Sequence, residues 1–239
     1  SLYKRGIGFI NVPTTLLSMV DASVGGKNGI NFLGNKNIIG TFNNPGGVFI
    51  FPGFLKTLST RETRSGYAEI IKHVLLSDVT RWNDFKNNPS ILFDEKHLID
   101  YIDHSVRFKV EVTVSDFREE GRRKILNFGH TIGHALESFS MAGNEPIRHG
   151  EAIAAGMIAE LFLSFKKTGF PEDEMFSAIH FIKNIFDDMN LGCPPEDLIP
   201  FLYADKKNAH DKIAFSLLKS PGVPAGVIFP EIESIVESL

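Results

Sequence analysis

Residues 123–151 limit most strongly what this chain can fold into. Residues 127–134 within this segment read NFGHTIGH. Arg123, Asn127, His130 and His134 follow one another at successive spacings of four, three and four residues, as they would on one face of a continuous helix. All four side chains would then lie within an arc of about 60°, opposite an apolar face. The pattern predicts one helix over 123–140 that shows a guanidinium, an amide and two imidazoles, a face able to hold a metal and an anionic ligand together.

An ordinary surface helix also has a polar stripe opposite an apolar one. Here the stripe carries His and Asn, which form helices less readily than Glu and Lys. Gly129 and Gly133 each cost about 1 kcal/mol relative to Ala inside a helix, so we expect a neighbour or ligand to approach closely there. The pair His130-x-x-x-His134 resembles half of a zinc-peptidase motif. It lacks the Glu that His-Glu-x-x-His requires, so we do not expect peptidase chemistry.

Composition excludes several classes of protein. The 239 residues are 43% hydrophobic and 23% charged, which suits one large domain or two small ones. The net charge of −4 gives no basic field for nucleic acid, and no apolar run reaches the ~20 residues that span a bilayer. Cys193 is the single cysteine, which rules out an intrachain disulfide and a Cys-rich zinc site. With no visible signal peptide, these features favour a cytoplasmic enzyme.

The periodicity changes near residue 56. Before it, residues 8–12 and 48–51 read as strands that end at Pro13 and Pro52, with loops near 24–29 and 34–37 between them. After it, helices are expected over 59–76, 95–114, 123–140, 150–168, 172–189 and 195–203, with short strands at 213–218 and 226–229 and a final helix after Pro230. We therefore predict two parts, residues 1–56 and 57–239.

Three further clusters have the composition of binding sites. In DASVGGK, residues 21–27, a Gly-Gly turn precedes Lys27, so that backbone amides and an ammonium can converge on an anion. The pair at 36–37, Lys-Asn, is a weaker signal of the same kind. Glu69, Lys72 and His73 share one face of a helix, where a surface salt bridge is the alternative explanation. His149, which belongs with the 123–140 helix described first, stands at a helix start, where an anion is favoured.

Several of these segments together resemble a known family. They are VPTTLL from 12, DASVGGK from 21, KNIIG from 36, GYAEIIKH from 66, NFGHTIGH from 127, HGEA from 149 and DKK from 205. They are similar to the signature blocks of 3-dehydroquinate synthase, in the same order and at similar spacings. The resemblance implies an α/β remnant of a dinucleotide-binding domain at 1–56, followed by a mainly α-helical metal-binding domain at 57–239.

The resemblance also implies an activity. The family converts 3-deoxy-D-arabino-heptulosonate 7-phosphate to 3-dehydroquinate and phosphate in the shikimate pathway. It is a phosphate-eliminating lyase that uses NAD and Zn²⁺ (or Co²⁺), and the metal polarises the substrate hydroxyl and carbonyl. The resemblance implies a homodimer, a phosphorylated sugar-acid as substrate, and neither nucleic acid nor membrane as partner.

The family's site residues carry over by position. The metal ligands would be Glu69, His130 and His149. Residues around the substrate ring and carboxylate, including the catalytic ones, would be Lys72, Lys109, Glu119, Asn127 and His134. Substrate binding would add Asp21, Lys27, Asn37, Arg123, Lys206 or Lys207, and Arg5 from the neighbouring subunit. Contacts to NAD would come from Thr14, Thr15, Asp21, Lys36 and Thr57.

Two departures from the family affect these expectations. Ala22 stands where the family often has Ser, which removes one hydroxyl near the cofactor. The glycine-rich cofactor segment of the family would precede Ser1 and is not in this sequence. We therefore expect these 239 residues not to turn over substrate by themselves, while the helical part folds and takes up metal.

Three other functions remain open. A related sugar-phosphate cyclase of the aminocyclitol or inosose type would share NAD, metal and helical domain but alter the substrate-binding block. A metal-dependent polyol dehydrogenase would lack the phosphate-binding set. An inactive zinc-binding helical module would close its metal site with a fourth protein ligand, as structural zinc sites do.

Overall fold

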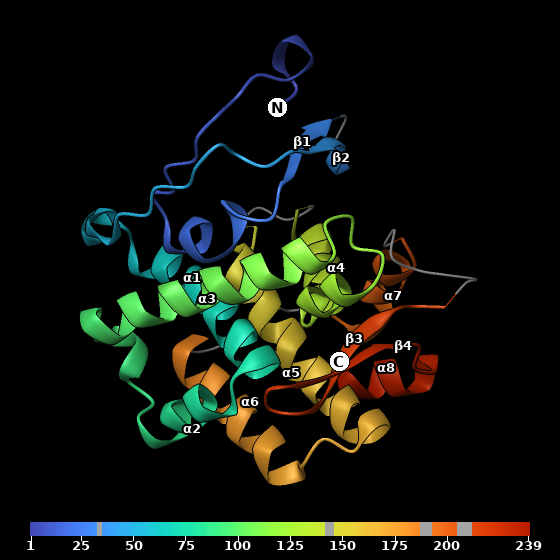
Figure 1. Ribbon diagram of the computed structural model, residues 1–239. Coiled ribbons are helices and arrows are strands. Elements are labelled where there is room, and N and C mark those ends of the chain that lie inside the picture. The colour runs from blue at the N-terminus through green and yellow to red at the C-terminus, as the bar shows by residue number, and fades with distance from the viewer. Residues whose placement is uncertain (33–34, 142–145, 187–192, 205–211) are drawn as a thin grey trace.

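The computed structural model describes residues 1–32, 35–141, 146–186, 193–204 and 212–239. The N-terminal part, blue in Figure 1, lies on one side of a larger helical body. It contains an antiparallel hairpin of β1 (Lys27–Phe32) and β2 (Asn35–Phe42), in which Ile30 faces Ile39. It also contains three short helical turns, η1 (Tyr3–Arg5), η2 (Ser18–Ala22) and η3 (Pro52–Thr57).

The predicted strands and loops of this part are wrong in detail. Residues 8–12 and 48–51 form only one parallel bridge, between Asn11 and Val48. Two hydrogen bonds hold it, from Asn11 N to Gly47 O (3.0 Å) and from Phe49 N to Asn11 O (2.9 Å). Among the described residues, no further strand pairs with this bridge to extend it into a sheet. Conversely, residues expected in loops form the hairpin. The sequence pattern did not indicate these strands, because they are rich in Asn and Gly and lack the apolar alternation that marks a strand.

Most predicted helices are present, with ends close to those expected where the structure describes them; the predicted end at 189 lies outside the described residues. They are α1 (Thr60–Ser77), α3 (Glu95–Ser115), α5 (His149–Thr168), α6 (Glu172–Phe186), α7 (Pro195–Tyr203) and α8 (Ile232–Ser238). The backbone N–H of Glu62 donates to Ser59 Oγ and caps α1 as expected. The sequence pattern missed α2 (Val79–Asn87), whose first turn donates to the side chain of Asp78.

The predicted helix over 123–140 is wrong as a single element. This segment instead forms a 3₁₀ turn, η5 (Arg122–Asn127), followed by α4 (His130–Ser140). Gly129 between them has φ +78°, in the left-handed region that glycine enters without a Cβ clash. Arg123 and Asn127 therefore lie on a different element from His130 and His134.

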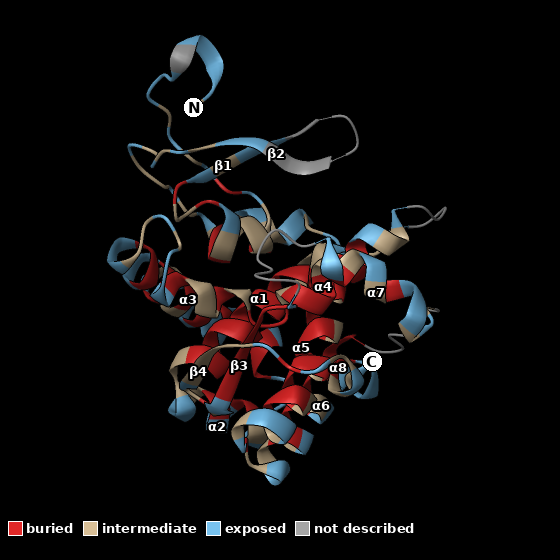
Figure 2. Cartoon of the chain, turned by 90° about the vertical axis from the view of Figure 1, so that its right-hand side faces the viewer, coloured by how far each residue is buried: buried red, intermediate tan, exposed pale blue. Residues whose placement is uncertain are grey.

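Two apolar clusters form the interior, shown red in Figure 2. Helices α1 and α5 contribute to the larger one, and Leu16, Met19 and Val20 from the N-terminal part are fully buried in it. The second cluster packs α4, α5 and α7 against the antiparallel pair β3 (Phe215–Ser220) and β4 (Val223–Ile228). None of the described helices is long and apolar enough to cross a membrane.

Glycines let α4 and α5 approach closely, as expected from Gly129 and Gly133. A Cβ added to Gly156 on α5 would lie 2.0 Å from the carbonyl oxygen of Gly129. A Cβ on Gly133 would lie 3.1 Å from the carbonyl oxygen of Ala152. Both obstacles are backbone atoms, which cannot rotate away as a side chain can. The neighbour that the glycines accommodate is therefore helix α5.

We predict that Gly156→Ala destabilises the fold by at least the ~1–3 kcal/mol typical of an overpacked core. The new methyl group must push α4 away from α5, and urea unfolding would measure the loss. Gly8→Ala is the control, because a Cβ there meets no atom within 4 Å. Equal unfolding midpoints for the two variants would contradict this account of the helix contact.

Candidate functional site

Glu69, His130 and His149 come together from three helices. Glu69 lies in α1 with no exposed surface, and the Nε2 atoms of His130 and His149 each lie 3.6 Å from its Oε1. One donor atom from each residue lies within 4.8 Å of the other two. Among the described residues, neither oxygen of Glu69 accepts a hydrogen bond of normal geometry. Because Lys72 contacts Oε2, a bound cation would lie on the Oε1 side of this buried carboxylate, beside the two imidazoles.

Both histidines are held through their other ring nitrogen. Nδ1 of His130 lies 3.1 Å from the carbonyl oxygen of Phe128, and Nδ1 of His149 lies 3.2 Å from Oε1 of Glu137. Both partners are acceptors, so each Nδ1 donates, and the Nε2 atoms are the ones turned toward Glu69. This arrangement, with the second nitrogen anchored, is the one that metal-binding histidines usually show.

A divalent metal fits between these donors. Zinc bonds oxygen and nitrogen ligands at about 2.0–2.2 Å, so tetrahedral ligand atoms lie about 3.4 Å apart. The two separations of 3.6 Å are close to that value. Three protein donors leave a fourth position for water or substrate, as catalytic zinc sites do. His134 is outside the cluster, with its ring centre 5.2 Å from that of His130 and 6.5 Å from that of His149.

Oppositely charged side chains surround the carboxylate. The Lys72 ammonium lies beside Oε2 of Glu69, and both residues are buried. Lys109 Nζ lies 2.6 Å from Oδ1 of Asp21 and donates to the Asp21 carbonyl. Burial works to raise the pKa of Asp21, but Lys109 and Lys72 outweigh it and hold that pKa far below its ordinary value. Burial likewise works to raise the pKa of Glu69, but the charge of Lys72 lowers it, and the net shift is downward.

The pKa values of His73 and His149 are shifted in opposite directions. Desolvation and the Lys72 charge lower the pKa of His73 to about 3, so His73 is neutral. Desolvation also works against a charge on His149, but the adjacent carboxylates of Glu137 and Glu69 raise its pKa to about 9. Carboxylates on both sides of one imidazole therefore make it strongly basic, which also makes it a good electron-pair donor.

A second group of polar side chains lies around the Gly-Gly turn. Glu119 contacts the Lys27 ammonium through one oxygen and accepts from Asn127 Nδ2 (2.6 Å) through the other. Glu119 has φ +65°, which is rare for a residue with a side chain and is often found at functional sites. Arg123 is buried and donates to the carbonyls of Gly25 and Phe117, at 2.7 Å each.

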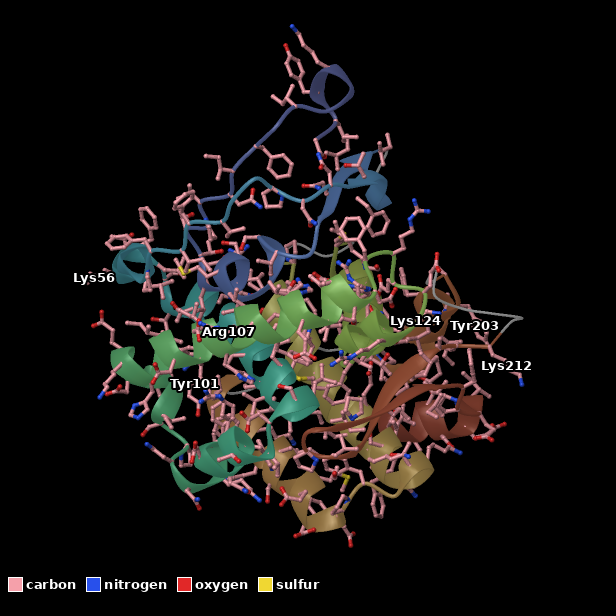
Figure 3. All side chains as sticks on the ribbon, viewed as in Figure 1. Lys56, Tyr101, Arg107, Lys124, Tyr203 and Lys212 are labelled. Carbon is pink, nitrogen blue, oxygen red and sulfur yellow. The ribbon has the colours of Figure 1, made fainter. Side chains whose placement is uncertain are left out.

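The structure therefore brings the predicted ligands and most ring-binding residues together. The cation Lys109 and the acid Asp21 join Glu69 and Lys72 in one cluster, and Lys27, Glu119 and Asn127 form the neighbouring one. Next to Arg123 on η5, the carbonyl of Lys124, labelled in Figure 3, accepts from Ser216 Oγ at 2.6 Å and ties η5 to β3.

The hydrogen bonds of the threonines predicted to contact the cofactor are local and do not reach the two clusters described above. Thr14 is exposed, Thr15 shares hydrogen bonds with Ser18, and Thr57 donates to the carbonyl of Phe54 at 3.4 Å. The side chains of Lys36, Asn37 and Arg5 are outside what the structure describes. Lys206 and Lys207 lie outside the described residues altogether.

Sequence reasoning missed two buried carboxylates beside the histidines. Glu137 holds His149, and its position, three residues after His134 and seven after His130, places it on the same face of α4. Glu160 accepts hydrogen bonds from the backbone at the start of α4. Its signal was a lone acid in the apolar run AAGMIAELFLSF at 154–165.

Family comparisons agree with the earlier resemblance. The family described as 3-dehydroquinate synthase N-terminal matches residues 1–65, and 3-dehydroquinate synthase C-terminal matches residues 66–208. The predicted boundary at 56 and 57 stays a prediction.

Three curated relatives are 3-dehydroquinate synthases. The chain is 44% identical to that of Parabacteroides distasonis over 92% of its length, 41% to that of Methylacidiphilum infernorum over 94%, and 42% to one of Leptospira interrogans over 94%. It spans 63%, 61% and 62% of the lengths of these relatives.

Solved structures of related cyclases share the fold. A 2-epi-5-epi-valiolone synthase from Streptomyces hygroscopicus with NAD⁺ and Zn²⁺ bound superposes with a TM-score of 0.87 at 26% identity, over 100% of this chain and 67% of that one. A 2-deoxy-scyllo-inosose synthase complexed with carbaglucose-6-phosphate, NAD⁺ and Co²⁺ gives 0.85 at 28% identity, over 99% and 67%.

These likenesses confirm the predicted fold, part of a dinucleotide-binding domain followed by a mainly helical domain. Both parts match the same family, and relatives above 40% identity cover more than nine tenths of the sequence. The chain belongs to the 3-dehydroquinate synthase family.

Proposed function

We propose that this chain provides the metal-binding and substrate-binding part of a 3-dehydroquinate synthase. The reaction would convert 3-deoxy-D-arabino-heptulosonate 7-phosphate to 3-dehydroquinate and phosphate, and the enzyme would be a phosphate-eliminating lyase of the shikimate pathway. The observation that carries the proposal is the buried Glu69 carboxylate, which faces two anchored imidazoles on one side and Lys72 on the other.

Glu69, His130 and His149 would hold Zn²⁺ or Co²⁺. The bound metal would act as a Lewis acid on a substrate hydroxyl and carbonyl. The role of the chain is to fix the positions of the three donors. Helix α1 supplies a buried carboxylate that cannot rotate out to solvent, and Phe128 and Glu137 fix the orientations of the two imidazole rings. The relation to a zinc-bound valiolone synthase and a cobalt-bound inosose synthase supports this assignment.

The cationic residues would bind the substrate. Lys72 and Lys109 present ammonium groups beside the triad, and together with Glu119, Asn127 and His134 they would contact the ring and carboxylate. Lys27 and Arg123, on the Gly-Gly side, would bind the phosphate end together with Asn37 and one of Lys206 and Lys207. Charged hydrogen bonds of this kind bind phosphate oxygens strongly.

Thr14, Thr15, Asp21, Lys36 and Thr57 would contact NAD. The cofactor would supply transient oxidation of one substrate hydroxyl, which acidifies the neighbouring C–H and lets phosphate leave. The same proposal includes a homodimer, in which Arg5 reaches the partner's site, and a cytoplasmic location. It also includes the inactivity of these 239 residues by themselves. They rest on the family resemblance.

A related sugar-phosphate cyclase is the second candidate. The solved structures that superpose with TM-scores of 0.87 and 0.85 are a 2-epi-5-epi-valiolone synthase and a 2-deoxy-scyllo-inosose synthase, not dehydroquinate synthases. Their sequence identities of 26% and 28% are below the 41–44% of the dehydroquinate synthases above, which favours the first candidate.

The test of function is phosphate release by the complete protein in which this sequence occurs, because the chain spans less than two thirds of the curated relatives named above. With NAD and zinc present, 3-deoxy-D-arabino-heptulosonate 7-phosphate should release phosphate, and a hexose 6-phosphate should not. Release from the hexose 6-phosphate alone would favour the second candidate.

We predict that metal binding depends on His130 far more than on His134. Removal of a direct ligand should weaken Zn²⁺ binding by more than the ~10–100-fold typical of losing an outer partner. His134→Ala should leave the dissociation constant within a few-fold of the parent, as measured by competition with a zinc chelator. Equal loss of zinc in the His130→Ala and His134→Ala chains would show that the ligand assignment is wrong.

We predict that Lys27→Met in the complete protein raises KM for the phosphorylated substrate. One charged hydrogen bond is worth about 1.5–3 kcal/mol, or about 10- to 150-fold. Arg123→Lys should also raise KM, because the planar fork is lost. The matched control is Arg122→Met, which removes an exposed ion pair with Glu111. An unchanged KM in the Lys27 variant would remove Lys27 from the phosphate site.

A further inference from the structure

Helix α5 carries one acid in the middle of an apolar stretch. Glu160 has no exposed surface, and burial of a carboxylate is costly unless hydrogen bonds compensate for lost water. Its two oxygens reach across to the start of α4. Oε2 accepts from the backbone N–H of Gly129 at 2.7 Å, and Oε1 accepts from that of Thr131 at 3.1 Å. The two bonded amides belong to the residues immediately before and after His130.

This contact meets a requirement at the end of a helix. The first N–H groups of a helix have no partner within it, and the positive end of the helix dipole favours an anion. The N-cap residue of α4 is Gly129, which has no side chain to cap the helix. A carboxylate from α5 therefore supplies the cap, and it ties the backbone around His130 to a different helix.

The same short segment is restrained from two other sides. Gly129 packs so tightly on α5 that a Cβ would lie 2.6 Å from Met157 Cγ. Thr131 Oγ1 donates to the carbonyl of Ala214, just before β3, at 2.9 Å. Once the backbone of residues 129–131 is fixed, the bond from Nδ1 of His130 to the Phe128 carbonyl leaves its Nε2 facing Glu69.

We propose that Glu160 is a positioning residue for His130. Its carboxylate holds the two flanking amides and so presets the imidazole in the orientation that binds the metal. The inference rests on the proposed ligand role of His130. It predicts that Glu160 acts on metal affinity without touching the metal, as outer partners of metal ligands do.

The first test measures Co²⁺ and Zn²⁺ affinity in Glu160→Gln. The amide is nearly isosteric, but its nitrogen cannot accept the second backbone hydrogen bond. We expect dissociation constants to rise by about 10- to 100-fold and the Co²⁺ absorption bands to shift. Glu174→Gln is the matched control, because Glu174 also accepts hydrogen bonds across a helix contact, from Trp82 and Lys86 on α2, which carries none of the three ligands.

The outcomes separate this inference from the proposed function. If His130→Ala leaves metal affinity unchanged, the ligand assignment itself fails, and the positioning role fails with it. If His130→Ala abolishes binding while Glu160→Gln binds as tightly as Glu174→Gln, the ligand assignment holds and the positioning role is overturned.

A measurement on the unmodified chain decides the case if Glu160→Gln does not fold. The amides of Gly129 and Thr131 should resist hydrogen exchange in metal-free protein, because the Glu160 bonds exist before metal binds. If both amides exchange rapidly without metal and become protected only after zinc is added, the clamp is not preset and the proposal is overturned.

Discussion

The buried carboxylate of Glu69 is the group on which the arrangement of this site depends. It is fully removed from water, so its charge must be balanced by neighbours that the fold supplies. Lys72 lies on one side, and two imidazole nitrogens lie at 3.6 Å on the other. Three helices must hold their positions for this balance to exist, which links the packing of α1, α4 and α5 directly to the chemistry proposed for the site.

The contact between α4 and α5 gives that arrangement its accuracy. Gly156 lets the two backbones approach to a distance that excludes any side chain, and His130 begins one helix while His149 begins the other. Carboxylates then complete the frame, with Glu137 on one histidine and Glu160 on the backbone around the other. Rigid backbone contacts, rather than the ligands alone, thus define where a metal would sit.

Periodicity predicted most helices, because a buried stripe repeats along the sequence and capping residues mark the ends. It could not predict the break at Gly129, since a glycine in a helical pattern can be either tolerated or used for its left-handed conformation. It also missed the β1–β2 hairpin, whose strands show no apolar alternation. The choice of His130 and His149 over His134 came from the family resemblance and not from spacing. Glu160 escaped notice because a lone acid in an apolar run does not show what it binds, and its partners are backbone amides distant in sequence.

X-ray absorption spectroscopy of the zinc-loaded chain tests the central claim most directly. The account predicts one zinc ion bound by two imidazole nitrogens and one carboxylate oxygen at about 2.0–2.2 Å, with one further oxygen from solvent. The spectrum should lose one imidazole in His149→Ala and keep both in His134→Ala. A site with a sulfur ligand, a site with three imidazoles, or a spectrum unchanged by His149→Ala would contradict the claim that these three helices form the metal centre.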